Sequence, residues 1–103
     1  MIETSLSKHF IEDRAERYAI IATKVGLGEV IMTTNRPRPS GDGYRVIELT
    51  STGVLIIKSH DGVVITVYCA TLTLVKSYFG VQRLSKGLYN AIRLNERKGY
   101  CHI

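Results

Sequence analysis

The sequence predicts an α+β fold, with an N-terminal helix packed on a three- to four-stranded antiparallel sheet and one or two C-terminal helices after it. Apolar residues recur every three to four positions near the N-terminus, alternate in short β-branched segments between tight turns, and return to helical spacing near the C-terminus. A chain of 103 residues without a linker-like stretch is expected to form a single domain over residues 1–103, with one modest core.

The first element is expected to be a helix from Ser5 to about Val25. Ser5 or Ser7 can cap its N-terminus, and Gly26 follows its end, where glycine is common. One apolar stripe follows the helical spacing and consists of Ile11, Ala15, Tyr18, Ala22 and Val25. On a helical wheel His9 lies opposite this stripe, whereas Arg14 borders it.

The middle of the chain is expected to form an antiparallel meander. A first strand covers Glu29–Thr34, and residues 35–43 (NRPRPSGDG) form a loop because they are rich in turn-forming residues. Three further strands are expected at Tyr44–Thr50, Val54–Ser59 and Val63–Cys69. Asp61-Gly62 lies between two β-branched segments and predicts a tight hairpin turn, which requires a positive φ.

Strict alternation along the last strand predicts two different faces. The expected core face carries Val63, Ile65, Val67 and Cys69. The opposite face carries Val64, Thr66 and Tyr68, is half polar and can line a site. Arg45 is an unusual charge within a strand, on one face with Ile47 and Leu49, and an edge position for its strand would explain it.

Two C-terminal helical segments follow the sheet. A short one is expected over Thr71–Phe79, stopped by Gly80, and a longer one from a cap at Ser85 to Lys98. The expected apolar side of the longer helix carries Leu84, Leu88, Ala91 and Ile92. Its expected polar side carries Lys86, Asn90, Arg93 and Arg97.

The net charge of +5 is unevenly distributed. Residues 1–69 contain eight basic and eight acidic residues, whereas the remaining third contains only the acid Glu96. The six basic residues of that third are Lys76, Arg83, Lys86, Arg93, Arg97 and Lys98. Such an asymmetry predicts a nucleic-acid-binding surface made by these six residues. The other interpretation is a solvated helix face that keeps the protein soluble.

Several classes of site and location are not expected. No apolar segment approaches the roughly 20 residues that cross a bilayer, so we expect no membrane association. The N-terminal MIETSLSKHFIEDR has no apolar signal core, which predicts a cytoplasmic protein with Cys69 and Cys101 as free thiols. Cys101-His102 has no second ligand pair, and no nucleotide-binding glycine loop is present, so neither a metal nor another cofactor is expected.

Two segments together resemble a known family. The first is KHFIEDRAERYAI, residues 8–20, with a histidine followed by two arginines; the second is GVVITVY, residues 62–68. This combination resembles BrnT-like toxins and their uncharacterised relatives in the barnase–EndoU–colicin–RelE superfamily of small metal-independent ribonucleases. The resemblance covers roughly Lys8 to Cys69, and the two arginines are three residues apart where the family pattern has four.

The resemblance implies a catalytic set of His9, Arg14, Arg17, Thr66 and Tyr68. Histidine titrates near neutral pH and can act as base or acid. Arginine binds phosphate with paired donors, and hydroxyl groups can orient it. The other interpretation is that His9 is a solvated helix residue paired with Asp13, that both arginines are surface charges, and that Thr66 and Tyr68 are ordinary strand residues.

The leading functional hypothesis is therefore an RNA-directed small domain that acts as a metal-independent, toxin-like endoribonuclease. The alternative is a non-catalytic phage or mobile-element protein that binds and modulates a nucleic-acid-processing machine. The expected partner is accordingly a nucleic acid, with RNA favoured, or a nucleic-acid-associated protein.

Overall fold

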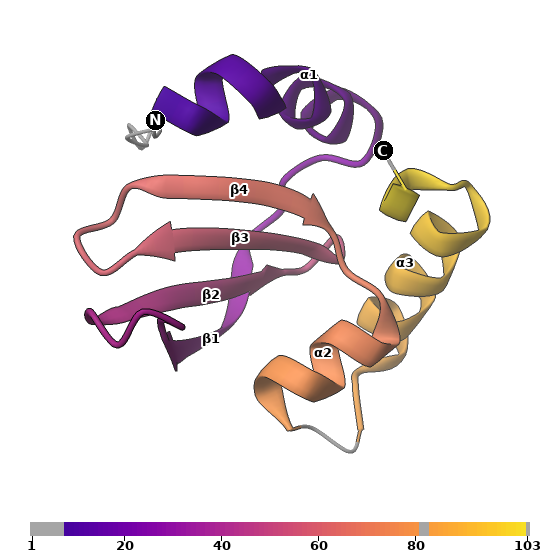
Figure 1. The fold of residues 1–103 in the computed structure, drawn as a ribbon. Coiled ribbons are helices and arrows are strands. Elements are labelled where there is room, and N and C mark those ends of the chain that lie inside the picture. The colour runs from indigo at the N-terminus through magenta and orange to yellow at the C-terminus, as the bar shows by residue number, and fades with distance from the viewer. Residues whose placement is uncertain (1–7, 81–82, 103) are drawn as a thin grey trace.

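The computed structural model describes residues 8–80 and 83–102, with side chains from residue 15 onward. Its elements in chain order are α1 (Lys8–Lys24), β1 (Val30–Pro37), β2 (Tyr44–Thr50), β3 (Val54–Ser59), β4 (Val64–Cys69), α2 (Leu72–Phe79), α3 (Lys86–Arg97) and the 3₁₀ turn η1 (Tyr100–His102). The strands form one antiparallel sheet in the order β1-β2-β3-β4, with one helix before it and two after it (Figure 1). The predicted α+β fold is confirmed.

Both faces of the sheet carry a hydrophobic core. Alternate residues of β3 belong to different cores, because successive strand side chains point to opposite faces. Val54 packs in a cluster with Ile21 of α1, whereas Leu55 and Ile57 pack in a second cluster with Ile92 of α3. In Figure 1, α1 lies along β4, whereas α2 and α3 lie together beyond the right-hand end of the strands. We call the face with Val54 and Ile21 the α1 face, and the face with Leu55, Ile57 and Ile92 the α2/α3 face.

The buried stripe of α1 differs from the predicted one. Ile21 is fully buried and Tyr18 and Val25 are half-buried, but Ala15 and Ala22 are exposed. The helix is oriented to bury isoleucine because a larger apolar side chain removes more surface from water than alanine does. The expected caps, Ser5 and Ser7, and the side chain of Ile11 lie outside the described residues.

The first strand is longer than predicted, and the loop after it is shorter. β1 continues to Pro37, which pairs with Tyr44 of β2, so the turn region begins at Arg38 rather than Asn35. The Arg38 amide donates to the Gly43 carbonyl at 3.1 Å and closes this turn. A proline is tolerated in β1 because this strand lies at the edge of the sheet, where one row of amides has no strand partner.

A β-bulge in β4 overturns the predicted strand faces. Ile57 pairs with Thr66 but Lys58 pairs with Val64, so Ile65 is an extra residue. Val64 is buried on the α1 face with Val67 and Cys69, whereas Val63 and Ile65 are only half-buried. The prediction that Val63 and Ile65 share the core face with Val67 is wrong, because the bulge breaks the two-residue period.

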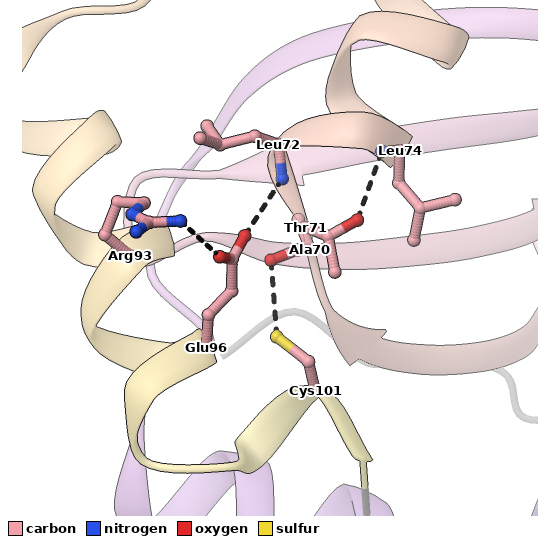
Figure 2. A network of polar contacts seen from close by, with 7 residues as sticks. All are labelled: Ala70, Thr71, Leu72, Leu74, Arg93, Glu96 and Cys101. Atoms are coloured by element: carbon pink, nitrogen blue, oxygen red, sulfur yellow. Dashed lines mark hydrogen bonds and ion pairs between the residues drawn. The ribbon is translucent and has the colours of Figure 1, made fainter.

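A polar network joins the C-terminal elements to the sheet (Figure 2). The Thr71 hydroxyl accepts from the Leu74 amide at 3.2 Å and caps α2. Glu96 of α3 accepts from the free Leu72 amide at 3.1 Å and pairs with Arg93 at 2.9 Å. The Cys101 thiol donates to the Ala70 carbonyl. These contacts position α2 relative to α3.

The predicted helix ends of the C-terminal segment are confirmed. Ser85 caps α3 by accepting from the Leu88 amide at 3.3 Å. Gly80 follows α2 in the left-handed conformation, with φ of 65°, which glycine adopts without strain. Leu88 and Ile92 are buried, as predicted for the apolar side of the helix. The residues of the predicted polar side, Lys86, Asn90, Arg93 and Arg97, are exposed. Asn95 is also buried, and its amide donates to the Thr52 carbonyl.

Candidate functional site

The α2/α3 face of the sheet contains a cavity of about 470 Å³. It lies where β2 begins and β3 ends, and its volume falls within the roughly 300–1,000 Å³ of small-molecule sites. It is lined by Arg36, Pro37, Pro39, Arg45, Ile47, Ile57, Ile65, Thr66, Tyr68 and Tyr78. We call it the sheet cavity.

Strand register explains why these residues meet. Arg36 pairs with Arg45, Ile47 pairs with Ile57, and Ile57 pairs with Thr66, and paired residues point to the same face of a sheet. Ile47 and Ile57 are buried and form an apolar floor between the arginines and the threonine. The bulge adds Ile65 to the same cavity wall, which a strictly alternating strand would not do.

Two buried polar atoms in the sheet cavity have no hydrogen-bond partner among the described residues. Only three such side-chain atoms occur in that part of the chain, and they are Arg45 Nε, Thr66 Oγ1 and Glu48 Oε1. Glu48 Oε1 lies 3.0 Å from Lys58 Nζ, which compensates its charge. Arg45 and Thr66 both line the cavity. Leaving a buried donor unpaired costs free energy, so a ligand with acceptor oxygens would relieve that cost.

Two tyrosines form the wall of the cavity next to α2. Their hydroxyl oxygens, in Tyr68 and Tyr78, are 3.3 Å apart. Burial raises the pKa of Tyr68 above its usual value, the hydrogen bond to Tyr78 raises it further, and the positive charge of Arg17 acts in the opposite direction. Tyr68 is therefore a neutral phenol at physiological pH, which can donate a hydrogen bond to an anion.

Arg36 fixes the position of Tyr78. Its guanidinium donates to the Ser77 carbonyl in the last turn of α2, where helix carbonyls lack intrahelical partners. The same guanidinium lies 5.7 Å from the centroid of the Tyr78 ring, a distance typical of a cation–π contact. Arg36 thus attaches the end of α2 to the edge strand β1 and holds the aromatic ring against the cavity.

The lining suits an anion with an apolar part. It provides two guanidinium groups and three hydroxyl groups, and none of its described residues is a carboxylate or a histidine. Hydrogen bonds from charged donors to an anion are stronger than those between neutral groups. The cavity therefore supplies donors and positive charge, whereas its lining includes no carboxylate or histidine that could act as a general base.

The structure brings together part of the predicted catalytic set. Thr66 and Tyr68 line the cavity. Arg17 is a half-buried residue of α1, which covers the other face of the sheet, and it is not among the residues that line the cavity. The side chains of His9 and Arg14 lie outside the described residues, so their predicted roles stay predictions.

Three cavity residues were missed by sequence reasoning. Arg45 carried a signal, a charge within a strand, but the edge-strand explanation is wrong because β2 lies between β1 and β3. Arg36 fell in the segment expected to be a loop. Tyr78 carried no local signal, because its place in the cavity depends on how α2 packs.

None of the six C-terminal basic residues lines the sheet cavity. All six, Lys76, Arg83, Lys86, Arg93, Arg97 and Lys98, are exposed. Ile92 of α3 is among the nearest neighbours of Gly53, in the β2–β3 turn, which is the opposite end of the sheet. Arg93 pairs with Glu96 (Figure 2), whereas Lys86 and Arg97 make no ion pair with any other described residue.

The described residues contain no cluster of three or more histidine, cysteine or acidic side chains, and among their helices none has the length and hydropathy of a bilayer-spanning segment. Cys69 and Cys101 are free thiols, and burial raises the pKa of Cys69 to about 11. Comparison with protein-family models, curated proteins and solved structures found no match to this chain.

Proposed function

We propose that this chain is an RNA-directed domain and that the sheet cavity binds a phosphate group of the RNA. The observation that carries the proposal is the pair of buried, unpartnered polar atoms, Arg45 Nε and Thr66 Oγ1, in a cavity lined by no described carboxylate. In this proposal oxygens of the phosphate accept from both groups, and the Tyr68 hydroxyl, which also lines the cavity, is a third donor. A cytoplasmic location belongs to the same proposal.

The charge of the chain supports a polyanionic partner. A net charge of +5 accelerates encounter with RNA through long-range attraction. Lys86 and Arg97, both exposed and free of ion pairs to described residues, can contact phosphates further along the strand. Arg93, on the same polar side of α3, is a weaker candidate for a phosphate contact, because its guanidinium already pairs with Glu96.

RNA cleavage is a second proposal, and it rests on the resemblance. The resemblance assigns Arg17 the role of a cation that stabilises a charged phosphorane, although Arg17 does not line the cavity. Cleavage also needs a base for the 2′-hydroxyl, which the cavity lining does not include. Binding is for this reason the better supported function.

A fluorescence titration with labelled single-stranded RNA tests the proposal. Arg45→Gln removes a cavity charge, and the matched control Arg38→Gln removes an exposed arginine that does not line the cavity. We expect the Arg45 variant to bind about tenfold more weakly, equivalent to about 1.4 kcal/mol, and the control to lose much less. Both losses should shrink at high salt, because bound phosphates release counterions. Equal binding by both variants contradicts the proposal.

Incubation of the same RNA with excess protein in EDTA tests the cleavage proposal separately. If the RNA is cut, Arg17→Ala and Tyr68→Phe should slow the cleavage. Intact RNA rules out metal-independent cleavage and leaves the binding proposal standing.

The alternative function, a non-catalytic module that modulates a nucleic-acid-processing machine, is tested by co-purification from cells. RNA that accompanies the wild type but is lost with Arg45→Gln supports direct RNA binding. A protein retained after nuclease treatment, together with no binding of free RNA, supports the alternative.

A further inference from the structure

We infer that the sheet cavity takes one whole unpaired nucleotide, with the phosphate at Arg45 and Thr66 and the base against Tyr78 and the isoleucine floor. The inference rests on the proposed function and adds a ligand class, a single strand with one nucleotide turned away from its neighbours.

The first argument is the composition of the cavity. A volume of about 470 Å³ exceeds what one phosphate group occupies. Half of the ten lining residues are apolar, and they are Pro37, Pro39, Ile47, Ile57 and Ile65. A phosphate alone would leave this apolar part in contact with water, whereas a flat base attached to the phosphate would cover it.

The second argument is the fixed aromatic ring of Tyr78. Its hydroxyl lies 3.3 Å from that of Tyr68, and the Arg36 guanidinium lies 5.7 Å from its centroid. A ring held at its hydroxyl and covered over one face by the guanidinium loses little conformational freedom when its remaining surface contacts a ligand. Proteins that bind single strands commonly place such rings against bases, and the contact tolerates any base because every base has a π-face.

The third argument concerns strandedness. In an RNA duplex the bases are stacked inside the helix, so a protein cavity reaches only phosphates, sugars and shallow groove edges. A site that combines phosphate donors with an apolar floor and an aromatic wall is useful only for a base outside the stack. The cavity therefore predicts a preference for single-stranded over double-stranded RNA.

Isothermal titration calorimetry with small probes tests the inference. The probes are inorganic phosphate, ribose 5-phosphate, uridine, and uridine and adenosine 5′-monophosphate. We expect the two monophosphates to bind at least about tenfold more tightly than ribose 5-phosphate, because only they add a base. Tyr78→Leu should reduce this advantage to below about threefold. Tyr78→Phe, which keeps the ring, should retain the advantage.

Each outcome bears on a different statement. Equal affinities for the monophosphates and ribose 5-phosphate overturn the nucleotide inference and leave the phosphate site intact. Absence of binding by every phosphate-bearing probe, with RNA binding unchanged by Arg45→Gln, overturns both. If circular dichroism shows that Tyr78→Leu does not fold, the ratio of monophosphate to ribose 5-phosphate affinity in the wild type tests the nucleotide inference without the variant.

Discussion

The hydroxyl groups of Thr50 and Thr66 differ in whether they have a hydrogen-bond partner. Thr50 is fully buried, and its oxygen accepts from the Val54 amide at 3.2 Å and lies 3.1 Å from the Thr52 hydroxyl. The Thr66 oxygen is buried without a partner among the described residues. The first hydroxyl stabilises a turn of the fold, whereas the second costs stability and is useful only to a ligand.

Replacement of each threonine by valine should therefore have opposite effects. Thr50→Val should lower the free energy of unfolding by about 1–3 kcal/mol, because the Val54 amide loses its acceptor. Thr66→Val should leave stability unchanged or raise it by about 1 kcal/mol, while weakening phosphate and RNA binding. Urea unfolding and RNA titration of both variants provide the two readouts. A loss of stability in Thr66→Val as large as in Thr50→Val would mean that its hydroxyl is a structural group.

Single residues differ in how well the sequence predicts their roles. Thr66 and Tyr68 were predicted through a local segment pattern, and Arg45 stood out because a charge within a strand is unusual. Arg36 and Tyr78 could not be predicted, because their contact joins β1 to α2 across 42 positions of the chain. Long-range packing of this kind leaves no mark on a local pattern.

At the scale of elements, the bulge in β4 determines what lines the sheet cavity. It moves Val64 to the buried α1 face and Ile65 to the cavity wall. Ile65→Ala should consequently destabilise the fold less than Val64→Ala, although it removes more atoms. We expect about 1.5–3 kcal/mol for the fully buried valine and less for the half-buried isoleucine. A larger loss of stability for Ile65→Ala than for Val64→Ala in urea unfolding would contradict the bulge and favour a strictly alternating strand.

The contact between α2 and α3 depends on Glu96 more than on Arg93. Glu96 accepts a backbone hydrogen bond from the start of α2, whereas Arg93 contributes only an ion pair at the surface. Glu96→Ala should cost about 1.5–3 kcal/mol, because a charged acceptor is lost, and Arg93→Ala below about 1 kcal/mol. Thermal unfolding of the two variants compares them. Equal small losses would show that the Leu72 amide finds another acceptor.

Local signals predicted most elements but not their irregularities. Turn residues and helix caps act within a few positions, and the bounds of β2, β3 and the end of α2 were predicted correctly from them. The extension of β1 to Pro37 depends on pairing with β2, which the loop-like composition concealed. The rotation of α1 toward Ile21 depends on the shape of the sheet it covers, and so does not follow from its own periodicity.

At the scale of the whole molecule, the buried Cys69 thiol and the half-buried Tyr68 phenol couple stability to alkaline pH. Burial raises the pKa of Cys69 from 9.0 to about 11, and that of Tyr68 is also raised by burial. The folded state thus keeps protons that the unfolded chain releases. Their contribution to stability is complete below about pH 9 and is lost as the pH rises through the folded pKa.

We accordingly expect the free energy of unfolding to fall between about pH 9 and 11. Cys69→Ala should flatten this decline, by at most about 1.4 kcal/mol per pH unit for one proton. Urea unfolding at intervals from pH 7 to 10.5 measures the slopes. If the free energy of unfolding falls with pH equally steeply in the wild type and the variant, the raised pKa of Cys69 in the folded state is contradicted.

The molecule separates its two candidate nucleic-acid surfaces, the sheet cavity and the basic side of α3, at opposite ends of the sheet. NMR chemical-shift mapping with a short single-stranded RNA distinguishes them within one experiment. A cavity that binds the phosphate predicts the largest shifts at the amides of Arg45, Thr66 and Tyr68, with smaller, salt-sensitive shifts near Arg97. Large shifts confined to α3, with the three cavity amides unmoved, would contradict binding in the sheet cavity.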